Sequence, residues 1–171
     1  RICYALIPIV PNSKGTIVVD GVFNNGAADN LIGLGLVLST EDIADNFMLY
    51  GIGRSHDGAN YEYGSYSLQL DASAFIGAID ADIQTANGAA TSDISRLMMS
   101  YEIKSVKLTD GTKQWFIIIE GYDNGVQMSG SAKKATYDLG IMGAPTLAGL
   151  ALVVGKASST PTLSVDSVEV H

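Results

Sequence analysis

The chain has 171 residues, of which 47% are hydrophobic and 16% charged, and its formal net charge is −8. This length and composition exclude a disordered chain and predict a single domain over residues 1–171 with one hydrophobic core. The negative charge and the lack of any Lys/Arg cluster argue against binding to nucleic-acid phosphates and to anionic membrane surfaces. No apolar run reaches the roughly 18 residues that a transmembrane helix needs, so no membrane insertion is expected.

Ten short segments rich in Val, Ile, Tyr and Leu recur between Gly, Asn and Asp residues, and each is predicted to be a strand. They cover residues 3–10, 16–23, 34–39, 47–52, 61–70, 97–108, 113–122, 126–132, 150–156 and 163–170. Strands at this spacing are typical of a sandwich or barrel. We therefore expect an all-β, antiparallel β-sandwich with one or two short helical turns and less than about 15% helix.

The beginning of the chain limits the covalent chemistry. Cys3 is the only cysteine, so neither an intrachain disulfide nor a zinc site built from several cysteines can form. The first residues contain no initiator Met and no secretion signal, which favours a piece of a longer protein.

The end of the second predicted strand and the turn after it hold the densest group of oxygen donors. Asp20, Asn24, Asn25 and Asp29 lie there beside glycines. Calcium takes six to eight such ligands, so these four residues are the candidate calcium site, although their spacing matches no EF-hand. Asx residues beside glycine also form turns, and that alternative remains open.

Helix signals are few. The segment 39–42 resembles a capping box that opens one turn through Asp45, and residues 82–98 could form a short helix or a long loop. Neither changes the predicted fold class.

The segment 50–66 combines four tyrosines with the only internal histidine. Tyr66, Leu68 and Leu70 alternate along the strand, so we expect them to form its apolar core face. Because successive residues of a strand face opposite ways, Tyr61 and Tyr63 are then expected to point away from the core.

This segment is the candidate ligand site. Sugar rings present apolar C–H faces and hydroxyl edges, which suit an aromatic ring flanked by polar side chains. The predicted ligand-binding residues are Arg54, His56, Asp57, Asn60, Tyr61 and Tyr63. The alternative is that this loop only connects two strands and its tyrosines pack on neighbouring side chains.

A three-stranded meander is predicted in the second half, with Asp110-Gly111 and Asn124-Gly125 as two-residue hairpin turns. The first turn predicts that Val106 pairs with Trp115. In that register Met99, Tyr101, Ile103, Phe116 and Ile118 form the core face.

Trp115, Ile117 and Ile119 then lie on the other, half-polar face. They form a possible second surface for a ligand or another chain, or a strand that a loop buries.

The last two predicted strands carry a resemblance. The segments 146–155 and 163–170 read TLAGLALVVG and LSVDSVEV. They resemble the last two strands of concanavalin A-like lectin and laminin-G-like sandwiches. The resemblance implies a jelly-roll whose concave face or rim loops bind glycans, in some members with calcium, and it assigns no specific residue.

Catalytic motifs are absent from the sequence. No glutamate begins the Glu-x-Asp-x-x-Glu motif of the laminarinase-type relatives, and no Gly-x-Ser-x-Gly elbow, phosphate loop or dinucleotide fingerprint occurs. A hydrolytic triad would need His56 or the terminal His171, whose tether is expected to be mobile. A glycosidase built from two distant carboxylates stays open.

The sequence thus predicts a non-catalytic recognition module that binds a carbohydrate or another cell-surface ligand. We expect it to belong to a larger extracellular, cell-surface, adhesin or virion fibre protein, with no cofactor other than calcium. The main alternative is a structural assembly domain of a capsid or fibre, partnered by its own copies or by the parent protein. An unrecognised glycoside hydrolase is the second alternative.

Overall fold

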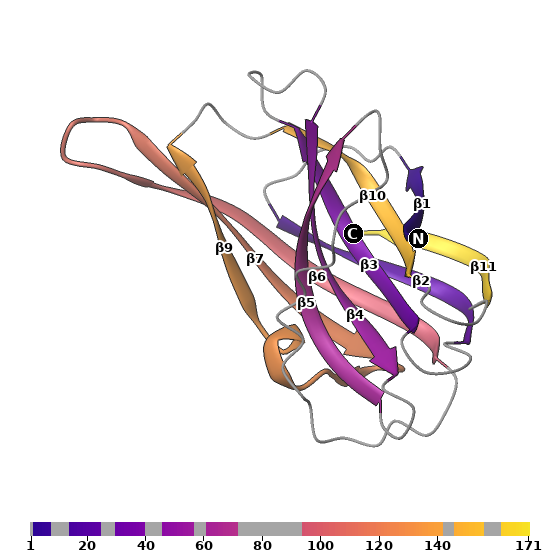
Figure 1. Cartoon of the computed structure of the whole chain (residues 1–171). Helices are drawn as coiled ribbons and strands as arrows, with labels where there is room; N and C mark the ends of the chain where they lie inside the picture. The colour runs from indigo at the N-terminus through magenta and orange to yellow at the C-terminus, as the bar shows by residue number, and fades with distance from the viewer. Residues whose placement is uncertain are drawn as a thin grey trace.

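The computed structural model describes residues 2–7, 14–24, 30–39, 46–56, 61–71, 94–141, 146–155 and 162–171. Within these ranges the chain forms two antiparallel sheets that pack as a sandwich (Figure 1). The predicted all-β sandwich is confirmed. No helix in the described ranges is long and apolar enough to cross a membrane.

Five strands form the first sheet, called sheet A. In spatial order they are β1 (Ile2–Ile7), β10 (Thr146–Gly155), β3 (Asn30–Ser39), β4 (Asn46–His56) and β5 (Tyr61–Asp71). The two predicted C-terminal strands are confirmed, but they lie in different sheets: β10 pairs with β1 and β3, whereas β11 (Thr162–Val170) belongs to the second sheet.

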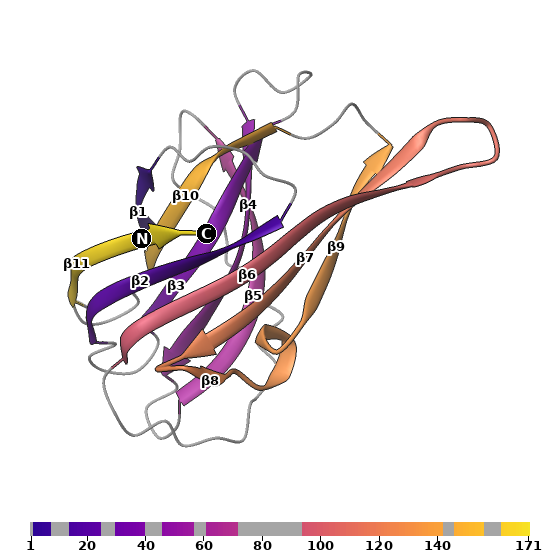
Figure 2. The ribbon, with the colours of Figure 1, turned by 180° about the vertical axis from the view of Figure 1, so that it is seen from behind.

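The second sheet, sheet B, has six strands. Its order is β11 (Thr162–Val170), β2 (Lys14–Asn24), β6 (Ile94–Lys107), β7 (Lys113–Asp123) and β8 (Val126–Gln127), and β9 (Ala135–Ile141) also pairs with β7. A 3₁₀ turn, η1 (Gly130–Ala132), connects β8 to β9. Seen from behind, β6 and β7 form one long, twisted hairpin (Figure 2).

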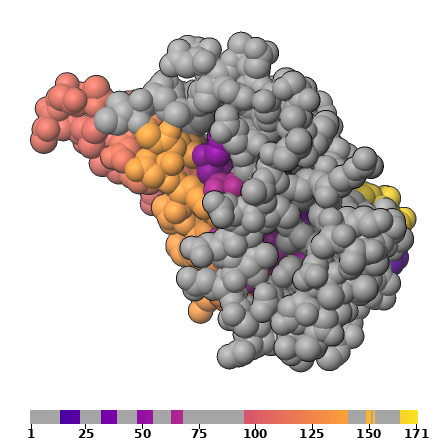
Figure 3. Space-filling view, in the orientation of Figure 1, coloured from indigo at the N-terminus to yellow at the C-terminus, as the bar shows by residue number. Residues whose placement is uncertain are grey.

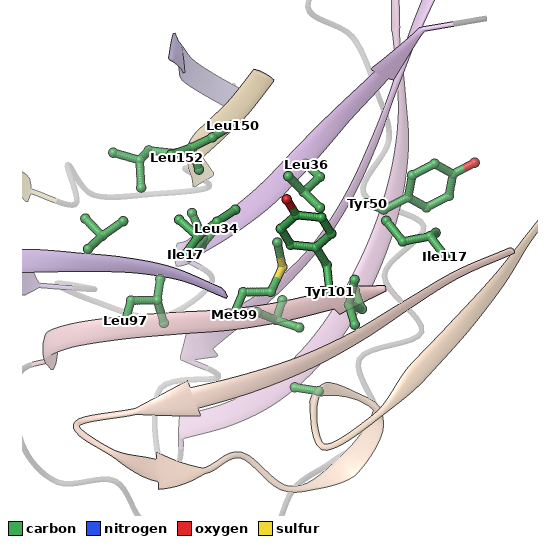
Figure 4. Packing of buried hydrophobic residues seen from close by; sticks show 14 of the residues in the cluster. Ile17, Leu34, Leu36, Tyr50, Leu97, Met99, Tyr101, Ile117, Leu150 and Leu152 are labelled. Atoms are coloured by element: carbon green, nitrogen blue, oxygen red, sulfur yellow. The ribbon is translucent and has the colours of Figure 1, made fainter. Parts of the chain in front are cut away.

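The core fills the space between the sheets, and the strands whose side chains are described contribute alternate residues to it, as the period of two in a strand requires. Leu34, Leu36 and Leu150 of sheet A meet Ile17 and Met99 of sheet B (Figure 4). All five side chains are completely inaccessible to solvent.

The hairpin turns explain both a success and an error of the sequence prediction. Asn124 and Gly125 have positive φ values of 48° and 82°, and Asp123 pairs with Val126, so the two-residue turn is confirmed. The turn at Asp110-Gly111 spans more residues than expected, because the last pair is Lys107 with Lys113.

This longer turn shifts the β6–β7 register by one residue. Ser105, not Val106, pairs with Trp115. A one-residue shift moves every side chain of a strand to the other face. Ile117 and Ile119 are therefore fully buried in the core and Trp115 packs against it, so the predicted second surface is wrong. Phe116 and Ile118, assigned to the core, lie on the outer face instead, whereas Met99, Tyr101 and Ile103 are buried as predicted.

Other local predictions fall differently. The sequence did not predict β9, because Asp138 and Gly140 interrupt the apolar alternation of its sequence, ATYDLGI. Backbone pairing with β7 makes this segment a strand. Residues 94–98 of the suggested helix belong to β6. The rest of that segment, 82–93, and the capping turn at 40–45 lie outside the described residues.

The outer face of sheet A is buried at its centre. Tyr66 of β5 lies directly opposite Gly51 of β4 and is only 2% exposed. A Cβ added to Gly33 would lie 2.6 Å from the Tyr66 hydroxyl oxygen, and one on Gly51 would lie 2.5 Å from the ring. Glycine at these positions therefore makes room for the tyrosine ring.

Candidate functional site

Of the six predicted ligand residues, the structure describes the side chains of Arg54 and Tyr63. Arg54 is 1% exposed, and its Nη1 lies 3.5 Å from Asp123 Oδ2 on the opposite sheet. Tyr63 donates its hydroxyl proton to the same carboxylate oxygen at 2.7 Å. Tyr63 packs against the core, so the expectation that it points away from the core is wrong.

These three residues, Arg54, Tyr63 and Asp123, form what we call the interior cluster. Burial, followed by the hydrogen bond to Asp123, raises the pKa of Tyr63 well above its ordinary value, so this phenol stays protonated as the donor. The cluster joins β4 and β5 to β7 across the sandwich. The polar ends of Arg54 and Tyr63 are therefore held against Asp123 of the opposite sheet.

The remaining predicted ligand residues are described only in part. The backbone of His56 pairs with Asn30 and Tyr61, which places it at the end of β4. The side chains of His56 and Tyr61 lie outside the described residues, as do Asp57 and Asn60 entirely. The role proposed for these four stays a prediction.

Of the four predicted calcium residues, the structure describes the side chain of Asp20 alone. Asp20 accepts two hydrogen bonds from Arg96, at 2.6 and 2.9 Å, and this arginine lowers the pKa of the Asp20 carboxyl. Asn25 and Asp29, with the side chain of Asn24, lie outside the described residues. Among the side chains that are described, no group of three acidic, His or Cys residues could hold a metal ion.

A groove of about 550 Å³ opens on sheet B, and sequence reasoning missed it. We call it the outer-face groove. Its lining comes from β2, β6, β7, the segment after η1 and the C-terminus: Lys14, Gly15, Thr16, Ser100, Tyr101, Glu102, Ile118, Glu120, Lys134 and His171. Most of these residues alternate with buried core residues, so they face away from sheet A.

Strand register sets the order of side chains in the groove. Lys14, Glu102 and Ile118 form one row across β2, β6 and β7, and Thr16, Ser100 and Glu120 form the next. Cross-strand neighbours in such rows lie about 4.5–5.5 Å apart at Cβ. The groove thus alternates charged groups and hydroxyls around one apolar side chain.

The charges in the groove are balanced in sign. Lys134 Nζ lies 3.3 Å from Glu120 Oε1, while Lys14 pairs across the strands with Glu102. Charged side chains held beside partners of opposite sign offer both hydrogen-bond donors and acceptors at fixed positions. This pattern suits a neutral polyhydroxylated ligand better than an ion.

The C-terminal residue is fixed in this site. The backbone N–H of His171 donates to Thr16 and its carbonyl accepts from Thr16, both at 2.9 Å. The expected mobile tether is therefore wrong. His171 Nε2 lies 3.2 Å from Glu169 Oε2. The absence of a side chain at Gly15 leaves room for this strand end, because an added Cβ would lie 2.7 Å from the His171 carbonyl oxygen.

The signal for the groove was present in the sequence but hidden by the register. Ser100, Glu102 and Lys104 alternate along one strand, and Ile118 and Glu120 along the next. With the correct pairing these residues share one face. The contribution of β2 and of the C-terminus depends on long-range pairing, which has no local sequence signal.

Comparison with known proteins adds no family to this picture. No protein-family model, no curated protein and no solved structure matches the chain.

Proposed function

We propose that this protein is a non-catalytic recognition module that binds a neutral carbohydrate in the outer-face groove. The observation that carries the proposal is the alternation of charge-balanced Lys and Glu pairs with the hydroxyls of Thr16 and Ser100 in one open groove. A sugar presents several hydroxyls, each a donor and an acceptor, and such a lining can satisfy both.

An apolar element also supports this reading. Ile118 lies within the groove, and Phe116 and Tyr122 share its face of β7. All three are partly exposed. Sugar C–H faces pack on such side chains while their hydroxyl edges reach the neighbouring polar groups.

The wider setting follows the sequence resemblance. Concanavalin A-like and laminin-G-like jelly-rolls bind glycans on one sheet face or at rim loops. The two-sheet architecture of this chain is compatible with that class. We extend the proposal to a place in a larger extracellular, cell-surface or virion fibre protein.

A glycan-array screen of the chain, run with calcium and with chelator, tests ligand class and metal dependence together. Hits are then titrated against Glu102→Gln and Lys134→Ala, which change the groove. Each variant should weaken binding about tenfold or more, equivalent to about 1.4 kcal/mol.

Lys133→Ala is the matched control, because Lys133 is exposed and adjacent in sequence but does not line the groove. Its affinity should equal that of the unmodified chain. Unchanged affinity in both groove variants, with folding intact, would place the ligand elsewhere.

Glycoside hydrolysis is a second candidate, favoured by the two carboxylates in the groove. Glu102 and Glu120 lie on neighbouring strands and the same face, two residues apart in register. Diagonal neighbours of this kind lie about 7–8 Å apart, within the range in which paired carboxylates cleave glycosidic bonds.

Incubation with each bound oligosaccharide separates the two functions. Recognition predicts intact sugar after long incubation, whereas hydrolysis predicts products that disappear in both Glu102→Gln and Glu120→Gln.

A further inference from the structure

The β6–β7 hairpin extends well beyond the body of the sandwich as a projecting arm (Figures 1 and 3). We define the arm as residues 103–114. Strand β2 pairs with β6 only up to Glu102, so no described strand flanks the β6 side of the arm. β9 reaches Gln114 on the other side. The end of the arm is therefore a two-stranded ribbon.

The arm is basic, although the chain as a whole is acidic. It holds three of the chain's 10 Lys and Arg residues, Lys104, Lys107 and Lys113, and only one of its 18 Asp and Glu residues, Asp110. All three lysines are exposed. Lys107 and Lys113 are direct cross-strand partners, and like charges in that position repel each other.

The arm also exposes apolar surface. Val106 is 51% exposed. An isolated two-stranded hairpin is marginally stable in water, so a basic ribbon with an exposed valine gains stability from a partner that supplies negative charge and apolar contact.

The opposite end of sheet B has the complementary properties. Among the described strands of that sheet β11 is the terminal one, and both views place it on the far side of the body from the arm (Figures 1 and 2). It carries Asp166 and Glu169 and no basic residue. Val165 and Val170 are 40% and 41% exposed on the same strand.

We propose that the arm of one chain docks on the β11 edge of a second copy of the chain. The lysines of the arm then face Asp166 and Glu169, and Val106 covers exposed valines of β11. Because the two contacting surfaces are different and lie at opposite ends of one sheet, the association is head-to-tail and generates a ring or a filament. Both elements also present strand edges to which another strand can add.

The first test measures self-association of the full chain by analytical ultracentrifugation over a range of protein and salt concentrations. The chain should associate at low salt and dissociate as salt is added, because screening weakens contacts between exposed charges. A chain that stays monomeric at low salt, up to its solubility limit, would overturn the proposal.

The second test uses charge reversal at each surface. The arm variant Lys107→Glu/Lys113→Glu and the edge variant Asp166→Lys/Glu169→Lys should each be monomeric, because each brings like charges together. An equimolar mixture should associate again, since the acidic arm then meets the basic edge and the unmodified arm meets the unmodified edge.

Circular dichroism of each variant confirms folding, which these exposed positions should tolerate. Restored association in the mixture cannot arise from misfolding, because it requires the arm and the β11 edge of both variants to be correctly folded. Variants that associate like the unmodified chain, or a mixture of folded variants that stays monomeric, would show that the arm and the β11 edge are not partners.

Discussion

Two tyrosines three residues apart on β5, Tyr63 half-buried and Tyr66 buried, occupy different environments. Tyr63 faces sheet B and donates a hydrogen bond to Asp123 within the interior cluster. Tyr66 faces away from sheet B and lies over glycines of β3 and β4. Its hydroxyl has no hydrogen-bond partner among the described residues.

The difference shows that one strand can be buried on both faces for unlike reasons. On the inner face the polar end of the ring is satisfied and ties the sheets together. On the outer face the ring fills space left by glycines, and burial raises the pKa of its hydroxyl far above the ordinary value. Burial of the Tyr66 ring stabilises the fold, whereas burial of its hydroxyl group destabilises the fold.

Removal of Asp123 is the largest test of the inner environment. Asp123→Ala removes a carboxylate beside the buried Arg54 guanidinium and the acceptor of the Tyr63 hydroxyl, which should lower the free energy of unfolding by about 3–5 kcal/mol. Urea denaturation measures the loss. The double variant Arg54→Met/Asp123→Leu is the control and should lose much less, because neither charge remains. An equal loss in both would mean that packing, rather than charge, dominates the cluster.

Removal of single hydroxyl groups compares the two tyrosines directly. Tyr63→Phe should destabilise the fold by about 1.5–3 kcal/mol, because it deletes a hydrogen bond to a charged group. Tyr66→Phe should be neutral or stabilising, because it deletes a buried hydroxyl without a described partner. Thermal and urea unfolding of the two variants give the comparison, and equal effects would contradict it.

The sequence predicted the elements of the fold well because their signals are local. The Asn124-Gly125 turn requires positive φ at both residues, and the sequence supplies residues that tolerate it. Apolar alternation likewise located most strands. β9 lacked such a signal, since its position depends on pairing with β7.

The candidate site was not predicted because its residues depend on register and on sheet assignment. Strand periodicity correctly placed Tyr63 and Tyr66 on opposite faces, but it cannot say which face meets the second sheet. A polar cluster such as Arg54 and Tyr63 looks the same in a sequence whether it is solvated or paired with a distant Asp123. To predict the groove, the sequence would have had to reveal the β6–β7 register and the pairing of Thr16 in β2 with His171.

Gly33 offers a smaller test of the outer environment. Gly33→Ala places a Cβ 2.6 Å from the Tyr66 hydroxyl oxygen and 2.9 Å from the Ile52 carbonyl oxygen, and should cost about 1–3 kcal/mol of stability. In a Tyr66→Ala background the same change should cost less, since only the carbonyl contact remains.

A double-mutant cycle on unfolding free energies measures this coupling. Gly111→Ala is the control: its positive φ of 89° strains an alanine, but no atom lies within 4 Å, so it should show no coupling to Tyr66. Full additivity of Gly33→Ala and Tyr66→Ala would refute the contact between ring and glycine.

The smallest effect is expected at the exposed counterpart of the interior cluster. Arg96 and Asp20 form a two-point ion pair on the outer face of sheet B, and solvent screens exposed pairs of this kind. Arg96 lowers the pKa of Asp20 below its ordinary value, so any stabilisation is present at neutral pH and disappears as the pH falls through the carboxyl's titration range. At pH 7 the melting temperature of Asp20→Asn should therefore be slightly lower than that of the unmodified chain. In acid the two melting temperatures should become equal. A loss at pH 7 as large as that of Asp123→Ala would show that exposure does not separate the two ion pairs.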